Sequence, residues 1–169
     1  MIVFTRNEFI FWTGGIFIEI SYRIGNIEDL KIITELSVLL YCGDYSHKHE
    51  YDELFTSNEE DLKHPQMAFF LAFDNDKAIG FSHVYIRNEY VIGTKHSPVG
   101  YLEGIYVCSN YRGQGVAKNL VKMSENWSKE NGCLEFASNC VLENKNSLAF
   151  HLKIGFYETN RLIHFAKKL

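Results

Sequence analysis

The feature that most constrains the fold lies mid-chain, where a strand-like segment leads through a glycine-containing loop into a helix-like segment. Residues 101–107 are rich in aromatic and β-branched side chains, as β-strands are. Gly113 and Gly115 follow, and residues 116–131 then carry apolar side chains at helical spacing. A helix that starts this way has unpaired backbone N–H groups at its positive dipole end, and these groups bind anions. The sequence therefore predicts an anionic ligand at this loop.

Length and charge limit the classes of protein that this chain can belong to. With 169 residues, of which 46% are hydrophobic, it can form one domain with a full core. Its formal net charge of -4 and its lack of a Lys/Arg cluster argue against a nucleic-acid partner. The four cysteines have no paired spacing and are expected to be reduced, as in a cytoplasmic protein.

The N-terminal segment is apolar over residues 9–20. It is too short to span a bilayer, and it lacks the basic start and the cleavage site of a secretory signal. We expect an N-terminal extension over residues 1–17, a single domain over residues 18–169, and no membrane partner. A cryptic signal or a surface anchor is the alternative interpretation of the extension.

The other segments predict an α/β (α+β) fold, with a mixed central sheet flanked by helices. Asn26 is expected to cap a first helix that reaches Leu40, and residues 41–52 are expected to form a loop. The expected strands are residues 18–24, 68–73, 78–87, 101–107, 134–138 and 162–167. The further helices are expected at residues 51–63, 116–131 and 147–153.

A second block of residues makes the glycine loop more specific. The loop lacks both the Gly-x-Gly-x-x-Gly pattern of dinucleotide sites and the lysine of nucleotide triphosphate sites. The segment 112–117 is instead accompanied by Asn144, Ser147, His151 and the segment 153–156. Together, the two blocks resemble the Gcn5-related N-acetyltransferase (GNAT) superfamily over about residues 18–169.

Within that superfamily, several segments look like the aminoglycoside 6'-N-acetyltransferases. They are residues 97–107, 111–118, 132–133, 137–138 and 155–159. The resemblance implies a GNAT fold, acetyl-CoA as the acetyl donor, a small-molecule amine as the acceptor, and a possible homodimer. It leaves open a polyamine, a small metabolic amine or a protein amine as acceptor, and also a non-catalytic acyl-CoA-binding module.

The resemblance also implies which residues bind acetyl-CoA. Backbone groups of a three-residue strand segment would contact the pantetheine arm, the glycine loop would hold the pyrophosphate, and one asparagine would bond to the donor beyond it. The residues concerned are Ile105, Tyr106, Val107, Arg112, Gly113, Gln114, Gly115, Val116, Ala117 and Asn144.

Glu103 would face the acceptor amine, and His151 would protonate the leaving thiolate. Tyr41 and Tyr90 would line the acceptor pocket, with Tyr41 standing where the family usually has tryptophan. The acceptor set is completed by Asn139 and Asn160, which stand where the family has acidic residues. These two replacements reduce the attraction for a polycation.

Each of these residues also has a purely structural interpretation. Glu103 can be an ordinary strand carboxylate in a salt bridge, His151 can pack under the donor or cap a helix, and Tyr41 and Tyr90 can be core aromatics. Cys108 is expected to pack rather than to act as a nucleophile. The pair His47 and His49, near Cys42 and Asp44, is expected to lie in a solvated loop, and no metal site is predicted.

Overall fold

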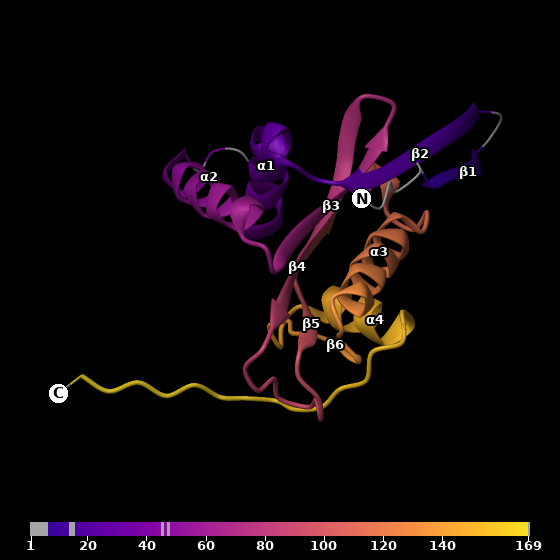
Figure 1. Cartoon of the computed structure of the whole chain (residues 1–169). Helices are drawn as coiled ribbons and strands as arrows, with labels where there is room; N and C mark the ends of the chain where they lie inside the picture. The colour runs from indigo at the N-terminus through magenta and orange to yellow at the C-terminus, as the bar shows by residue number, and fades with distance from the viewer. Residues whose placement is uncertain (1–6, 14–15, 45, 47, 169) are drawn as a thin grey trace.

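The computed structural model describes residues 7–13, 16–44, 46 and 48–168, and Figure 1 shows their arrangement. Its strands are β1 (Asn7–Thr13), β2 (Ile16–Ile24), β3 (Met67–Asp74), β4 (Lys77–Arg87), β5 (Val99–Val107) and β6 (Glu135–Ser138). Its helices are α1 (Leu30–Tyr41), α2 (Lys48–Lys63), α3 (Val116–Glu130) and α4 (Lys145–Lys153), with short 3-10 turns η1 (Ile27–Asp29) and η2 (Ser109–Tyr111).

The six strands form one sheet in the order β1-β2-β3-β4-β5-β6. Every neighbouring pair is antiparallel except β5 and β6, which are parallel. The predicted mixed sheet is therefore confirmed. Helices α1 and α2 lie on one side of it, and α3 lies on the other (Figure 1).

Strand alternation explains why both faces of the sheet are covered. On β3, Phe69 and Leu71 pack in the core cluster that contains Ile33 and Leu36 of α1. The intervening Phe70 packs on the opposite side, in the cluster that contains residues of α3. Because both faces are buried, β3 is almost continuously apolar, as a central strand must be.

The entry to α1 is fixed by local hydrogen bonds. The Asn26 side chain accepts from the Glu28 backbone N–H at 2.8 Å, and Asp29 accepts from the Asn26 N–H at 3.0 Å. This reciprocal pair is a capping box, and it confirms the predicted cap. Arg23 of β2 adds an ion pair to Asp29 at 2.6 Å, which ties the helix start to the sheet.

A β-bulge in β5 shapes the central part of the sheet. His83 of β4 pairs with Gly104, but its neighbour Val84 pairs with Leu102, so Glu103 is the extra residue. On its other edge, β5 pairs with β6 only over residues 99–102. Beyond Leu102 this edge of β5 has no neighbouring strand among the described residues.

The structure differs from the sequence expectation at three places. Helix α2 begins at Lys48, so the expected loop over residues 41–52 is shorter than predicted. Residues 7–13 of the expected extension form β1, which pairs with β2, while residues 1–6 and 14–15 lie outside the described part. No helix in the described residues is long and apolar enough to cross a membrane.

The third difference is the C-terminal strand expected at residues 162–167, which was a wrong prediction. The described residues 156–168 form no strand. Residues 156–159 lie beside β6, and the end of the segment runs away from the body of the molecule (Figure 1). A strand needs the hydrogen bonds of a neighbouring strand, and this segment pairs with no strand of the described residues. Its apolar side chains are left in solvent: Leu162 is 63% exposed and Phe165 is 91% exposed.

Candidate active site

The predicted anion site lies at the start of α3, directly after β5. Gly113 and Gly115 have φ values of 79° and 83°, a left-handed conformation that side chains disfavour. Gly115 is the N-cap of α3 and offers no side chain to cap it. Among the backbone hydrogen bonds of the described residues, the first that closes into α3 runs from the Asn119 N–H to the Gly115 carbonyl, at 3.0 Å. The preceding N–H groups can therefore bind an anion.

Three contacts hold this loop in place. The Arg112 Nε donates to the Val107 carbonyl at 2.8 Å, and the Gln114 amide donates to the Asn110 carbonyl at 2.9 Å. The Tyr111 hydroxyl donates to Asp74 at 2.6 Å, and this hydrogen bond raises the pKa of Tyr111 to about 12. The loop is thus fastened both to β5 and to the β3–β4 hairpin. The Tyr111–Asp74 contact spans 37 residues and was not predicted from the sequence.

The open edge of β5 connects this loop to the bulge. Ile105, Tyr106 and Val107 lie beyond the end of the β5–β6 pairing, so their backbone groups on that edge face no strand of the described residues. Such groups can pair with an extended ligand as a neighbouring strand would. Asn144 lies at the start of α4, where its side chain accepts from the Ser147 N–H at 2.9 Å.

His151 lies where β5 and β6 separate. Its Nδ1 lies 2.7 Å from the Ser147 carbonyl and its Nε2 lies 3.1 Å from the Ser138 hydroxyl. Ser138 in turn donates to the Leu102 carbonyl at 3.0 Å. A carbonyl can only accept, so Nδ1 carries a proton, and the ring is fixed with Nε2 toward the gap between the two strands. Ser138 is a partner that the sequence analysis missed.

Glu103 lies at the bulge, on the side of the sheet that carries α1. Tyr101 and Gly104 of β5 pair with Tyr85 and His83, which are two residues apart on β4, so Tyr101 and Gly104 face the same side of the sheet. Glu103 is two residues after Tyr101, so strand alternation directs its side chain to that side as well. Arg87 Nη2 donates to Glu103 Oε1 at 2.6 Å, and the guanidinium lies 3.6 Å from the Tyr101 ring centroid. Both charged side chains are about a quarter exposed. The structural interpretation of Glu103 as a salt-bridge partner therefore holds, and it leaves one face of the carboxylate for a ligand.

Tyr41 closes the other side of this space. A Cβ atom added to Gly104 would lie 3.2 Å from the Tyr41 hydroxyl, so the glycine makes room for the ring. Burial of the hydroxyl, together with the charges of Glu103 and Asp61, raises the pKa of Tyr41. The residue as a whole is 59% exposed, which is unlike a core aromatic.

The remaining predicted acceptor residues lie at the surface. The Asn139 side chain lies near the Tyr101 hydroxyl, and the Tyr101 ring packs on the guanidinium of Arg87, so Asn139 is in the neighbourhood of the Arg87–Glu103 pair. Tyr90 is 77% exposed in the loop after β4, and Asn160 is exposed in the C-terminal segment. The structure thus gathers Glu103, Tyr41 and Asn139, while Tyr90 and Asn160 extend from two separate segments.

Comparison with known proteins assigns the fold to a family. The profile described as "Acetyltransferase (GNAT) family" matches residues 31–156. The chain belongs to this family. The match runs from α1 to the end of the second motif block, so it includes both blocks on which the resemblance was based.

This GNAT protein is also similar to individual acetyltransferases. It is 42% identical, over 75% of its length and 82% of the relative's, to aminoglycoside N(6')-acetyltransferase type 1 of Acinetobacter genomosp. 13. The structure of AAC(6')-Iy in complex with the bisubstrate analogue CoA-S-monomethyl-acetylneamine is 35% identical, with a TM-score of 0.79 over 89% of this chain and 99% of that one. AAC(6')-Ih from Acinetobacter baumannii is 34% identical, with a TM-score of 0.79 over the same shares of the two chains.

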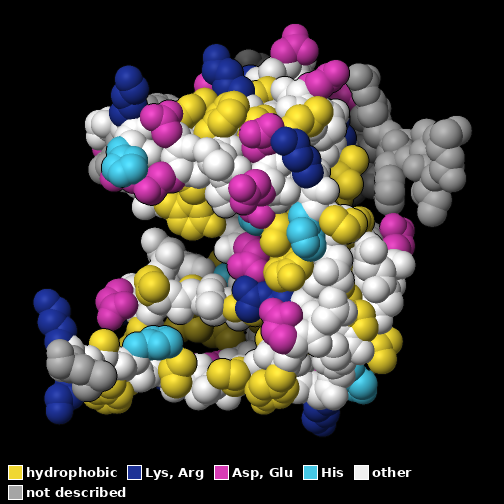
Figure 2. Space-filling view, turned by 60° about the vertical axis from the view of Figure 1, so that its left-hand side comes forward, with side chains coloured by type: hydrophobic (Ala, Val, Ile, Leu, Met, Phe, Trp, Pro, Cys, Tyr) yellow, Lys and Arg dark blue, Asp and Glu magenta, His cyan; other side chains and the backbone are white. Residues whose placement is uncertain are grey.

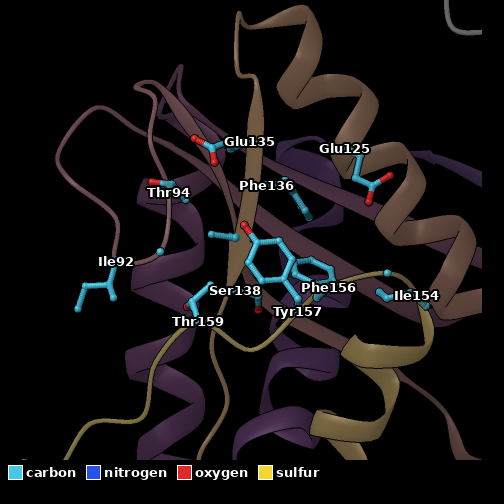
Figure 3. A pocket seen from close by; sticks show the side chains of 13 residues that line it. Ile92, Thr94, Glu125, Glu135, Phe136, Ser138, Ile154, Phe156, Tyr157 and Thr159 are labelled. Carbon is cyan, nitrogen blue, oxygen red and sulfur yellow. The ribbon is translucent and has the colours of Figure 1, made fainter.

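A groove of about 280 Å³ runs along β6 of this GNAT domain (Figure 3). Glu135, Phe136 and Ser138 line it from the strand, and Phe156, Tyr157 and Thr159 line it from the C-terminal segment. The groove lies at the edge of the sheet and includes neither the glycine loop nor Glu103. It marks the side of β6 on which the structure places no strand.

Two residues considered for other chemistry have ordinary surroundings in the described part of this GNAT protein. Cys108 packs against the α1-side core, and burial raises the pKa of its thiol, which disfavours the nucleophilic thiolate. His49 is on α2, 3.7 Å from Glu53, while His47 lies outside the described residues. The described residues hold no group of three or more His, Cys, Asp or Glu side chains that suits a metal ion.

Proposed function

We propose that this protein transfers the acetyl group of acetyl-CoA to the 6'-amino group of aminoglycosides. The observation that carries the proposal is the open edge of β5, which joins the anion-binding loop at one end to Glu103 at the other. A donor with a phosphate group and an extended arm fits one end, and an amine fits the other. The bisubstrate analogue bound by AAC(6')-Iy combines these two chemical parts, which supports the proposal.

Acetyl-CoA supplies an acetyl thioester, and the chain's residues supply its binding site. The N–H groups from Gly113 to Ala117 would bind the pyrophosphate, with Arg112 and Gln114 bracing the loop. Backbone groups of residues 105–107 would pair with the pantetheine arm. Nothing lies within 4 Å of a Cβ placed on Gly113, so the space around it is open to a ligand.

The acceptor amine needs help because it is mostly protonated at neutral pH. With a pKa near that of lysine, about 10.4, exposing the neutral form at pH 7 costs about 4–5 kcal/mol. Glu103 would hold the amine and receive its proton, directly or through water. The amine nitrogen then bonds to the carbonyl carbon, and the carbon–sulfur bond breaks. A backbone N–H at Gly104 would stabilise the carbonyl oxygen, and His151 would protonate the departing thiolate.

The identity of the acceptor needs a direct test, because two residues of the predicted acceptor set are neutral. Asn139 and Asn160 can accept hydrogen bonds from ammonium groups, but they do not supply the charge of a carboxylate. Asn139 lies near the Tyr101 hydroxyl, and Tyr101 lies beneath Arg87, which supports a polar contact between Asn139 and a sugar. A polyamine or another less bulky amine is the competing acceptor.

A homodimer and a cytoplasmic location are further parts of the proposal. Residues 162–165 expose apolar side chains, and the groove lies along the free edge of β6. A second copy of the chain would cover both. Each C-terminal segment would add a strand to the β6 edge of its partner. All four cysteines are free, as expected for a compartment that keeps thiols reduced.

A substrate panel tests the function. The wild-type protein is incubated with acetyl-CoA and kanamycin, spermidine or a lysine-containing peptide, and release of the CoA thiol is followed. We expect turnover with kanamycin and a product acetylated at the 6'-nitrogen by NMR. The Glu103→Gln variant should lose about 100-fold in kcat and keep its calorimetric affinity for acetyl-CoA. Turnover of spermidine alone would overturn the acceptor, and donor binding without any turnover would favour a binding module.

A further inference from the structure

A second carboxylate faces the space beside Glu103. Asp61 lies in the last turn of α2, and its Oδ2 is 3.6 Å from the Nε2 of His83 on β4. His83 is the direct β4 partner of Gly104, the residue after Glu103. Burial raises the pKa of Asp61, His64 opposes that rise, and the charge of Glu103 adds a smaller rise, so the two carboxylates interact.

The charges around Asp61 are not balanced. Glu103 has Arg87 as its cation at 2.6 Å. Asp61 instead lies against the ring of His83, whose side chain is only 12% exposed. Burial lowers the pKa of His83 to about 4, so the ring is neutral at pH 7 and its buried Nε2 has no hydrogen-bond partner among the described residues.

The other titratable neighbours of Asp61 do not remove this imbalance. His64, just after α2, lowers the pKa of Asp61, but by less than burial raises it, and Glu60 of the same helix adds a smaller rise. Tyr41 of α1 is protonated, since its pKa is raised. The Asp61 side chain is itself only 20% exposed. A carboxylate this far from water gains from a cationic partner, and the protein supplies no lysine or arginine that contacts it in the described residues.

This acidic site opens on the face below α1 and α2. Figure 2, turned toward that face, shows the surface hollowed there, with acidic side chains along the inner wall of the hollow. Asp61 contacts His83, the strand partner of Gly104, and the Tyr41 hydroxyl lies against Gly104. A ligand that reaches Glu103 past Tyr41 would therefore pass close to Asp61.

We propose that Asp61 is a specificity-determining residue of the acceptor site, where its carboxylate binds an ammonium group of a polycationic acceptor other than the amine that reacts. This inference rests on the proposed function. The reacting amine must lose its proton beside Glu103, whereas the other amines stay charged and need anionic partners. Because Asn139 and Asn160 are neutral and Glu103 is paired with Arg87, Asp61 would supply the unpaired negative charge of the site.

The test compares Asp61→Asn with Glu60→Gln, a loss of the same charge at an exposed position of the same helix. Binding of kanamycin to each protein in the presence of CoA is measured by calorimetry, together with KM for kanamycin and for acetyl-CoA. We expect Asp61→Asn to weaken kanamycin binding and raise its KM about tenfold. The KM for acetyl-CoA, which reports an intact fold, should change less than about twofold, and Glu60→Gln should behave as the wild type.

A second acceptor separates charge recognition from simple disturbance of the site. For 6-amino-6-deoxyglucose, which carries a single amine, Asp61→Asn should leave kcat/KM within about twofold of the wild type. Equal losses for both acceptors, or unchanged kanamycin affinity in Asp61→Asn, would overturn the assignment of Asp61. Those results leave wild-type acetylation of kanamycin intact, so they are distinguishable from a failure of the proposed function, in which the wild type itself turns over no aminoglycoside.

Discussion

Arg87 donates two hydrogen bonds to one carboxylate oxygen of Glu103 across β4 and β5, from Nε to Oε1 at 3.1 Å and from Nη2 to Oε1 at 2.6 Å. Tyr101 lies beneath the guanidinium and fixes its plane. The carboxylate is thereby held in one position at the bulge, with its second oxygen available to an acceptor. Arg87 is a positioning residue in this arrangement, and it was identified only from the structure.

Removing Arg87 should therefore impair acetylation without loss of the donor site. In Arg87→Met, Glu103 keeps its burial and loses its cation, which leaves an unpaired charge and a carboxylate free to turn away. We expect kcat/KM for kanamycin to fall tenfold or more and the affinity for acetyl-CoA to stay the same. Arg161→Met, which breaks the exposed pair with Glu158, is the matched control and should have wild-type kinetics. Equal kinetics for the two variants would refute the role of Arg87.

Two glycines at opposite ends of α3 allow a controlled test of the anion loop. Gly113 and Gly132 have φ values of 79° and 83°, and a Cβ on either would meet no protein atom within 4 Å. Gly113→Ala and Gly132→Ala should each cost about 1 kcal/mol of unfolding free energy because of the left-handed conformation. Only Gly113→Ala should also weaken acetyl-CoA binding, by tenfold or more in calorimetry, since its methyl group would meet the ligand. Loss of binding in both variants, or in neither, would contradict the proposed loop.

His83 should make the protein less stable in acid. Burial lowers its pKa from 6.5 to about 4, so between these values the unfolded chain binds a proton that the folded protein does not. Stability is therefore lost as the pH falls through this window, by on the order of 3 kcal/mol when the loss is complete. Urea unfolding at pH 7 and pH 5 should show this loss in the wild type and a smaller one in His83→Phe. The exposed His164→Gln should retain the wild-type pH dependence, and a flat wild-type profile would contradict the prediction.

The exposed C-terminal segment gives a test of the proposed dimer. Phe165 is 91% exposed, and burying such a ring against a second copy contributes about 2–3 kcal/mol. Phe165→Asp should raise the dimer dissociation constant at least tenfold, as measured by light scattering after size exclusion. Ile27→Asp, at a half-exposed apolar residue before α1, should leave the dimer intact. A wild-type protein that is monomeric at all concentrations would refute the dimer.

Most of the helices and strands could be predicted because their signals are local. The alternation in β3, the apolar stripe of α3 and the Asn26 cap depend on residues a few positions apart. The start of α2 was placed late because its first turn has no apolar periodicity. The strand expected at residues 162–167 has strand-like residues, but a strand exists only where a neighbour pairs with it.

The sequence by itself determined the order of the elements from β2 to α4, the position of the glycine-containing anion loop and the family resemblance, since each depends on short stretches of chain. Only the tertiary structure decided that Arg87 meets Glu103, that His151 meets Ser138 and that Asp61 lies against His83. The physical reason is that these contacts depend on strand register, on one extra residue in β5 and on how α2 packs on the sheet. Those features join segments far apart in the chain, and no local pattern encodes them.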